Sequence, residues 1–379
     1  MDPSPQRYQV ARHELRRSRL VPDPDAPAAR ALANGEARLR IEHFALTANN
    51  ITYAAFGEAM KYWQFFPTGD AEWGCIPVWG FAEVVESRAD GVLPGERLYG
   101  YFPMGTFLVV QPARLAAHGF VDASAHRREL AAVYNQLVRC AADPGYDAAR
   151  EAQQALLKPL FVTSFLIDDF LAENDSFGAH RVLLSSASSK TAYGTAFCLA
   201  RRRATAGAAG TARVVGLTSA AHLDFTRGLG CYDEVAVYDD LQKLDATVPT
   251  VYIDFAGNAQ LRRKVHEHFG DALLHSGSVG GTHWDALGGG CGLPGPRPVL
   301  FFAPAQIARR STAPPAGWGA AELQLRIGAA WRDFVAVVDD LRAPWLRVET
   351  GAGPDALRAV CLALLDGRAD PRTGHMLRL

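Results

Sequence analysis

Residues 181–200, RVLLSSASSKTAYGTAFCLA, constrain the fold of this chain more than any other stretch. The apolar run 182–184, flanked by turn-forming residues, predicts a buried parallel strand, and the small residues after it lead into an amphipathic helix. A doubly wound sheet uses this sequence of strand, turn and helix to present N–H groups and a helix N-terminus to a pyrophosphate. Of the glycines usual in such a turn only Gly194 is present, so an ordinary turn that binds no ligand is the alternative.

Length and composition exclude several classes of protein. A chain of 379 residues favours two domains, and 49% hydrophobic with 21% charged residues is typical of large buried cores. The formal net charge of −1 gives no electrostatic reason to expect nucleic acid or an acidic membrane as a partner. No apolar run reaches the length of a membrane span, and no signal-peptide core is evident. Six scattered cysteines without a CxxC pair predict reduced thiols and a cytoplasmic location.

The order of predicted elements changes along the chain. Short strands separated by Gly and Pro turns fill the first 111 residues, and residues 125–157 have a helical pattern. From residue 182 to 279 strands alternate with helices, which indicates a parallel α/β sheet. We expect residues 201–211 to form a surface loop whose three arginines lie at a solvated helix end, and residues 375–379 to form a closing strand.

Several motifs occur in a specific order. They are Val78-Trp79-Gly80-Phe81-Ala82-Glu83-Val84-Val85, Pro94-Gly95-Glu96-Arg97-Leu98-Tyr99-Gly100 and Gly228-Leu229-Gly230-Cys231-Tyr232-Asp233-Glu234-Val235. With the turn after residue 184, this order resembles the medium-chain dehydrogenase/reductase superfamily, and its zinc-free quinone oxidoreductases and enoyl reductases in particular. The resemblance implies an α/β protein with a GroES-like, mostly β catalytic domain and a Rossmann-type doubly wound parallel sheet. The catalytic domain would comprise residues 1–157 completed by 343–379, and the nucleotide-binding domain residues 158–342.

The expected metal site is absent from the sequence. Zinc-dependent members of the superfamily need Cys and His at positions that here hold Asn49 or Asn50 and Trp79. Tryptophan cannot ligate a metal, and no remaining Cys/His set has tetrahedral ligand spacing, so we predict no metal. His266 and His268 lie two apart on a predicted helix, where they diverge, and we interpret them as surface residues.

The candidate catalytic residues are Asn49, Asn50 and Tyr53. The resemblance places both asparagines on the active-site loop, where an amide could hold a substrate oxygen and the Tyr53 phenol could donate a proton. Either asparagine could instead cap the following helix, and Tyr53 could belong to the core. Tyr134 and Asn135 are a further pair of possible donors.

The predicted cofactor is NADP(H). NAD-preferring folds carry an acidic residue at the end of the second strand of the nucleotide domain. Here the stretch after Gly216 has no acidic residue before Asp224. The hydroxyls and the imidazole in this stretch, together with Lys190, could bind a 2′-phosphate instead. The candidate cofactor-binding residues are Ser188, Ser189, Lys190, Thr191, Gly194, Thr218, Ser219, His222, Phe255, Ala256, Gly257, Ser278, Val279 and Gly280.

Two functional hypotheses remain open at this point. The first is a zinc-independent, NADPH-dependent oxidoreductase that reduces a quinone, enone, enoyl or carbonyl substrate. The second is a non-catalytic nucleotide-binding or interaction protein descended from such a reductase. The apolar segment 298–303 is a candidate edge strand that could pair with its copy, which predicts a homodimer.

Overall fold

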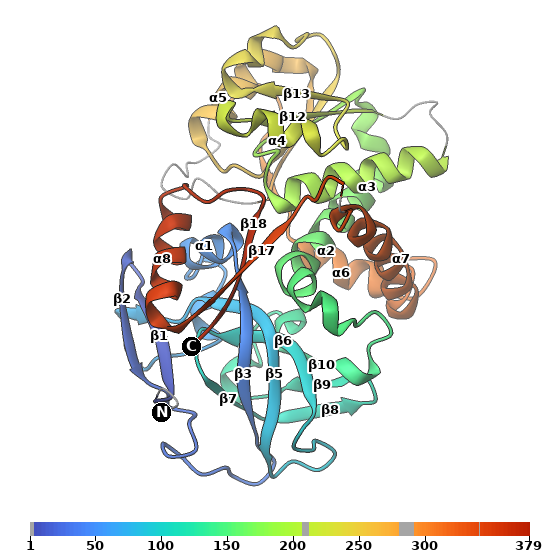
Figure 1. The fold of residues 1–379 in the computed structure, drawn as a ribbon. Helices are drawn as coiled ribbons and strands as arrows, with labels where there is room; N and C mark the ends of the chain where they lie inside the picture. Colours follow the sequence, from blue (N-terminus) through green and yellow to red (C-terminus); the bar gives the residue numbers. More distant parts are fainter. Residues whose placement is uncertain (1–3, 207–211, 280–291, 341) are drawn as a thin grey trace. The chain divides into compact units, whose positions relative to one another are not determined.

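The computed structural model describes residues 4–206, 212–279, 292–340 and 342–379. Contacts divide the chain into two compact units (Figure 1). We call Met1–Leu156 with Arg347–Leu379 the first unit, and Leu157–Leu346 the second unit. The catalytic and nucleotide-binding roles assigned to such a division remain predictions.

The first unit is built on a nine-stranded sheet. Its strands, in spatial order, are β17 (Arg347–Ala352), β18 (Thr373–Arg378), β3 (Ala37–Leu46), β5 (Pro77–Ser87), β6 (Arg97–Pro103), β10 (Gln136–Arg139), β9 (Gly119–Asp122) and β8 (Pro112–Ala116), and β7 (Phe107–Val110) also pairs with β3. The C-terminal strand β18 pairs antiparallel with β3 and places His375 opposite Leu46. The last strand of the chain therefore completes the sheet that the first 140 residues begin.

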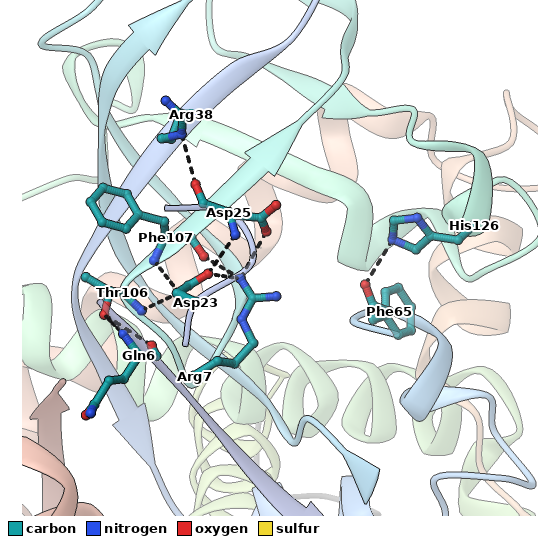
Figure 2. A network of polar contacts seen from close by, with 9 residues as sticks. All are labelled: Gln6, Arg7, Asp23, Asp25, Arg38, Phe65, Thr106, Phe107 and His126. Carbon is teal, nitrogen blue, oxygen red and sulfur yellow. Dashed lines mark hydrogen bonds and ion pairs between the residues drawn. The ribbon is translucent and has the colours of Figure 1, made fainter. Parts of the chain in front are cut away.

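A smaller sheet and two helices complete the first unit. The sheet contains β2 (Glu14–Pro22), β1 (Gln6–Ala11) and β4 (Trp73–Gly74), and the helices are α1 (Ala48–Ala55) and α8 (Gly353–Leu365). A buried ion pair ties β1 to the chain beyond β2, because Arg7 Nη2 donates to Asp23 Oδ1 at 2.8 Å and to Asp25 Oδ2 at 3.0 Å (Figure 2). Asp23 also accepts the N–H groups of Thr106 and Phe107, which satisfies the lone pairs of a buried carboxylate.

The second unit contains a six-stranded parallel sheet. The spatial order is β13 (Glu234–Val237), β12 (Arg213–Thr218), β11 (Arg181–Leu184), β14 (Thr250–Asp254), β15 (Leu273–Ser278) and β16 (Val299–Leu300). The order reverses at β11, so connections leave β11 and β14 in opposite directions and create the switch point at which α/β sheets bind ligands. Helices α3 (Lys190–Ala206), α4 (Leu223–Gly228), α5 (Ala259–Phe269), α6 (Ala303–Ser311) and α7 (Ala320–Val338) belong to this unit, and α2 (Glu151–Glu173) enters it.

Short 3-10 turns connect many of these elements. They are Tyr62–Gln64, Ala125–Arg127, Ala132–Asn135, Cys140–Ala142, Ala148–Arg150, Asp175–Gly178, Ala220–His222, Tyr238–Lys243 and Gly270–Ala272.

Three local predictions differ in whole or in part from the structure. Residues 125–157 are not helical throughout, because β10 pairs with β6 and β9 and sheet pairing outweighs the helix propensity of an Ala- and Leu-rich stretch. The segment 298–303 does provide a strand at the sheet edge, as predicted, but that strand, β16, has only two residues, and the last residue of the segment begins α6. Residues 201–206 continue α3, so the predicted loop does not begin at Arg201, but the three arginines do lie at the end of this helix.

Candidate functional site

Helix α1 carries the three candidate catalytic residues. Its N-cap is Thr47, whose hydroxyl accepts the N–H of Asn49 at 3.3 Å, while Asn50 Oδ1 accepts the N–H of Thr47 at 2.8 Å. Asn50 Nδ2 donates to the Pro77 carbonyl at 2.8 Å. The amide of Asn50 therefore holds the helix start and anchors it to β5, as the capping interpretation described. The side chain of Asn49 is only half-buried and hydrogen-bonds Tyr53.

Tyr53 is a buried phenol surrounded by polar neighbours. Trp79 Nε1 donates to the Tyr53 oxygen at 3.4 Å, and Asn49 and Tyr134 also hydrogen-bond it. Burial raises the pKa of Tyr53 well above its ordinary value, although these hydrogen bonds each act to lower it. Tyr53 therefore keeps its proton at physiological pH and is suited to donate a hydrogen bond.

Further aromatic side chains surround Tyr53 and form what we call the aromatic cluster: Tyr53, Tyr62, Trp79, Tyr99, Tyr101 and Tyr134. Ring centroids are 4.6 Å apart for Tyr53 and Tyr62 and 4.7 Å apart for Tyr101 and Tyr134. The Tyr62 and Tyr134 hydroxyls lie 3.3 Å apart. Tyr134 thus lies next to Tyr53, in a 3-10 turn and not in the helix expected for residues 125–157. Asn135 does not join this cluster through its amide, which donates to the Arg127 carbonyl at 3.1 Å.

Two functional candidates were not predicted from the sequence: Tyr101, a member of this cluster, and Arg127, which lies beside it. The Tyr101 hydroxyl and Arg127 Nη2 are buried and have no hydrogen-bond partner among the described residues. Burial lowers the pKa of Arg127, against the attraction of Asp122, whose carboxylate lies 3.1 Å from Arg127 Nε. Two buried donors without acceptors are costly, so this corner of the cluster is suited to an acceptor oxygen.

A hydrogen bond to the backbone and two phenylalanine rings hold the surroundings of Arg127 in place. His126 Nε2 lies 3.2 Å from the Phe65 carbonyl oxygen (Figure 2), and the Phe65 ring packs edge-on against Tyr101 at 5.4 Å. The Arg127 guanidinium lies over the Phe66 ring at 4.7 Å. The alternation in strand β6 was the available signal for this face, since Tyr99 and Tyr101 are two residues apart and both contact Trp79.

The second candidate site is the turn between β11 and α3. The Ser185 hydroxyl donates to Asp254 Oδ1 at 2.9 Å and accepts the N–H groups of Phe255 and Ala256. Asp254 is buried and also pairs with Arg262 Nε at 2.9 Å. This arrangement joins the turn to the end of β14, and it occupies the N–H groups of two predicted cofactor-binding residues.

Most backbone N–H groups of this turn already donate hydrogen bonds to acceptors within the protein. Those of Ser185, Ala187 and Ser189 donate to backbone carbonyls, and that of Ser186, a residue with φ of 47°, donates to the Tyr238 hydroxyl at 3.2 Å. The N–H of Ser188 has no acceptor among the described residues. Ser188, Ser189, Lys190 and Thr191 lie at the N-terminus of α3, where the helix dipole favours an anion.

The end of β12 contributes a second group of predicted residues. Ser188 Oγ lies 3.2 Å from His222 Nδ1, which brings the two turns together. Thr218 Oγ1 is buried and has no hydrogen-bond partner among the described residues. Ser219 follows Thr218 and precedes the 3-10 turn that contains His222. This strand end therefore presents hydroxyls and an imidazole.

Two glycines of the predicted site have structural reasons to lack a side chain. A Cβ on Gly194 would lie 2.7 Å from Ser164 Oγ, so this glycine allows α3 to approach α2 closely. Gly257 has φ of 70° and its N–H donates to Asp254 Oδ1 at 3.0 Å. Ser278 and Val279 follow at the end of β15, where the N–H of Val279 donates to the Asp254 carbonyl. Gly280 lies outside the described residues.

The interpretation of both helix histidines as surface residues was wrong for His266. Its ring is buried between the Pro294 carbonyl at 2.8 Å and Ser276 Oγ at 3.0 Å, whereas His268 Nε2 contacts the Leu244 carbonyl. The two rings diverge, as predicted. In the part of the chain that the structure describes, no group of three His, Cys, Asp or Glu side chains could hold a metal.

Comparisons with known proteins place the chain in a family. A family model described as "Protein of unknown function (DUF2855)" matches residues 44–370. The chain belongs to this family. A search of curated proteins found no match for this DUF2855 chain. Within its described residues, no helix is both long and apolar enough to cross a membrane.

Solved structures share the fold of the DUF2855 chain over nearly its whole length. CurA from Vibrio vulnificus, in complex with NADPH, aligns with a TM-score of 0.58 and 12% identity and covers 98% of each chain. The quinone oxidoreductase from Coxiella burnetii aligns with a TM-score of 0.54 and 11% identity over 99% of each chain. The yhdH oxidoreductase from Salmonella enterica, in complex with NADP, has a TM-score of 0.50 and 11% identity, covering 96% of this chain and 95% of that one. These likenesses confirm the predicted fold, a GroES-like unit and a Rossmann-type unit.

Proposed function

We propose that this protein is a zinc-independent, NADPH-dependent oxidoreductase that acts on a quinone, enone, enoyl or carbonyl substrate. The observation that carries the proposal is the aromatic cluster, in which a protonated Tyr53 lies beside two buried donors without acceptors, Tyr101 and Arg127. A substrate oxygen that gains negative charge needs such donors. The fold is shared with an NADPH complex and a quinone oxidoreductase, which supports the same reaction class.

The second unit provides residues that fit NADP(H). Thr218 Oγ1 is a buried hydroxyl without a partner among the described residues, and the Ser188 N–H at the start of α3 has no acceptor there. Ser188, Ser189, Lys190 and Thr191 would bind the pyrophosphate, and Thr218, Ser219 and His222 the ribose with its 2′-phosphate. Phe255, Ala256, Gly257, Ser278, Val279 and Gly280 would line the rest of the site, and Gly194 would position α3. When bound, NADPH would supply the hydride.

The roles of the protein's own groups follow from their contacts. Asn49 and Tyr53 would donate hydrogen bonds to the substrate oxygen, and Asn50 would hold α1 in position through Thr47 and Pro77. Because burial raises the pKa of Tyr53, it would act as a hydrogen-bond donor, and it or solvent would supply the proton. Trp79 would orient the Tyr53 hydroxyl by donating to its oxygen.

The experiment is a panel of quinones, enones and 2-enoyl thioesters, with oxidation of NADPH followed optically. We expect at least one substrate to turn over, and we expect Asn49→Ala and Tyr53→Phe to lower turnover by about tenfold or more, equivalent to about 1.4 kcal/mol. Asn50→Ala should act mainly through stability. If both Asn49→Ala and Tyr53→Phe keep full turnover, these roles are wrong.

One observation favours a second function, a non-catalytic nucleotide-binding or interaction protein. The N–H groups of Ser185, Ser186, Ala187 and Ser189 are used within the protein, which leaves few donors in the turn for a pyrophosphate. This function would be supported if no compound of the panel turned over, whether or not NADPH bound.

A further inference from the structure

A cavity lies in the second unit, away from the turn after β11. Its volume is about 270 Å³, and its lining comes from α2, α3, α7 and the loop before α7. Arg201 and Arg202 contribute to it from the last turns of α3, eleven and twelve residues after Lys190. At 1.5 Å per residue, Arg201 is about 16 Å along the helix from Lys190. The cavity is therefore separate from the predicted nucleotide site.

The charges that line this cavity are predominantly positive. The lining contains three arginines, Arg201, Arg202 and Arg326, and one carboxylate, Asp168. Asp168 is buried and is already held by Arg202, whose Nε and Nη2 donate to it at 2.8 and 2.7 Å. The other two cations of the lining are Arg201 and Arg326, whose carboxylate partners, Asp333 and Glu322, are not among the lining residues.

Both of these arginines retain donors. Arg201 uses Nε to pair with Asp333 at 2.7 Å, and Arg326 uses Nε to pair with Glu322 at 2.7 Å. Their terminal nitrogens have no acceptor among the described residues. These nitrogens could therefore bind a ligand, because a guanidinium can donate two parallel hydrogen bonds to a carboxylate. The Trp318 ring lies 4.2 Å from the Arg326 guanidinium carbon and restricts how that side chain can turn.

Apart from Thr205, the rest of the lining is apolar. Phe165, Cys198, Ala329, Ala330 and the Trp318 ring provide the surface on which a hydrocarbon or aromatic body could pack. Burial raises the pKa of Cys198 well above its ordinary value, so this thiol remains neutral and contributes only apolar surface.

We propose that this cavity binds a small organic carboxylate, with its acid group on Arg201 and Arg326 and its apolar body against Phe165, Ala329 and Trp318. A volume of 270 Å³ suits a body of hexanoate or benzoate size. This site would be independent of the proposed reductase function, since none of its residues belongs to the aromatic cluster or to the turn after β11.

The test uses the full chain with sodium benzoate and sodium hexanoate as probes, and isothermal titration with thermal unfolding as readouts. We expect both acids to bind and to raise the melting temperature, and the neutral benzamide and hexanamide to bind at least about tenfold more weakly. Arg201→Gln and Arg326→Gln should each weaken benzoate binding by about tenfold. Arg263→Gln, an exposed arginine on α5 paired with Glu267, is the matched control and should bind as the wild type does.

Ala329→Leu distinguishes binding in the cavity from a general attraction of the acids to surface arginines, because it fills the cavity and keeps every arginine. It should abolish binding of both acids while the melting temperature without probe stays within a few degrees of the wild type. Equal binding of acid and amide, no acid binding by the wild type, or full binding by Ala329→Leu would each overturn the proposal. If a glutamine variant unfolds, the Ala329→Leu result decides the question.

Discussion

Glu151, the first residue of α2, contacts three side chains of the first unit and provides a quantitative test of the structure. Arg97 donates to it through Nε at 2.5 Å and Nη2 at 2.7 Å, and the Tyr146 hydroxyl donates at 2.6 Å. His43 Nε2 lies 2.9 Å from its second oxygen. Burial acts to raise the pKa of Glu151, but these hydrogen bonds outweigh it and lower the pKa to about 2 from an ordinary value of 4.5.

The sign of the effect follows from this lowered pKa. The stabilisation is fully present above pH 4.5 and is lost as the pH falls toward 2, because the unfolded chain takes up the proton first. At about 1.4 kcal/mol per pH unit, the wild type should lose about 2 kcal/mol of unfolding free energy from this group between pH 7 and pH 3. Glu151→Gln cannot take up that proton, so it should be less stable at pH 7 and should lose about 2 kcal/mol less on acidification.

The assay is urea unfolding at pH 7, 5 and 3, followed by fluorescence and far-UV circular dichroism. Glu129→Gln, at an exposed position, is the matched control and should follow the wild-type pH profile. Parallel pH profiles for the wild type and Glu151→Gln would show that Glu151 does not have a strongly lowered pKa, and would refute the reasoning.

Two further predictions concern packing and assembly. Gly194→Ala should lower the free energy of unfolding by about 1–3 kcal/mol, because the added Cβ would lie 2.7 Å from Ser164 Oγ. The control Gly228→Ala, whose Cβ would have no atom within 4 Å, should be neutral or stabilising. Urea unfolding midpoints compare the two variants, and equal stability would contradict the close approach of α2 and α3. Leu300, 58% exposed on β16 at the edge of the sheet, should contribute to a homodimer. Light scattering should show a dimer for the wild type and a monomer for Leu300→Lys, and a monomeric wild type would count against the dimer.

Much of the fold could be predicted from local pattern and from the order of motifs. The apolar run before the turn became β11, and the alternating residues 37–44 became most of β3. Residues 125–157 could not be predicted in the same way, because the pairing of β10 depends on strands distant in sequence. His266 was misjudged for a similar reason, since the carbonyl of Pro294 and the hydroxyl of Ser276 that bury it lie 28 and 10 residues away.

The candidate sites were only partly predictable. Period-two alternation could indicate the face shared by Tyr99 and Tyr101, but no sequence pattern shows that the Tyr101 hydroxyl and Arg127 lack acceptors. The loss of glycines from the turn was visible in the sequence. The use of Ser185 to tie the turn to Asp254 was not, because that contact joins residues 69 positions apart.

Binding of NADPH to the purified protein tests the central claim most directly. Titration followed by the fluorescence of the reduced nicotinamide should show saturable binding of NADPH, with NADH weaker, because the end of β12 presents Thr218, Ser219 and His222 and no acid before Asp224. Lys190→Ala should weaken binding of NADPH, whereas Lys264→Ala, at an exposed position on α5, should not. Absence of NADPH binding, or binding of NADH as tight as that of NADPH, would contradict the account.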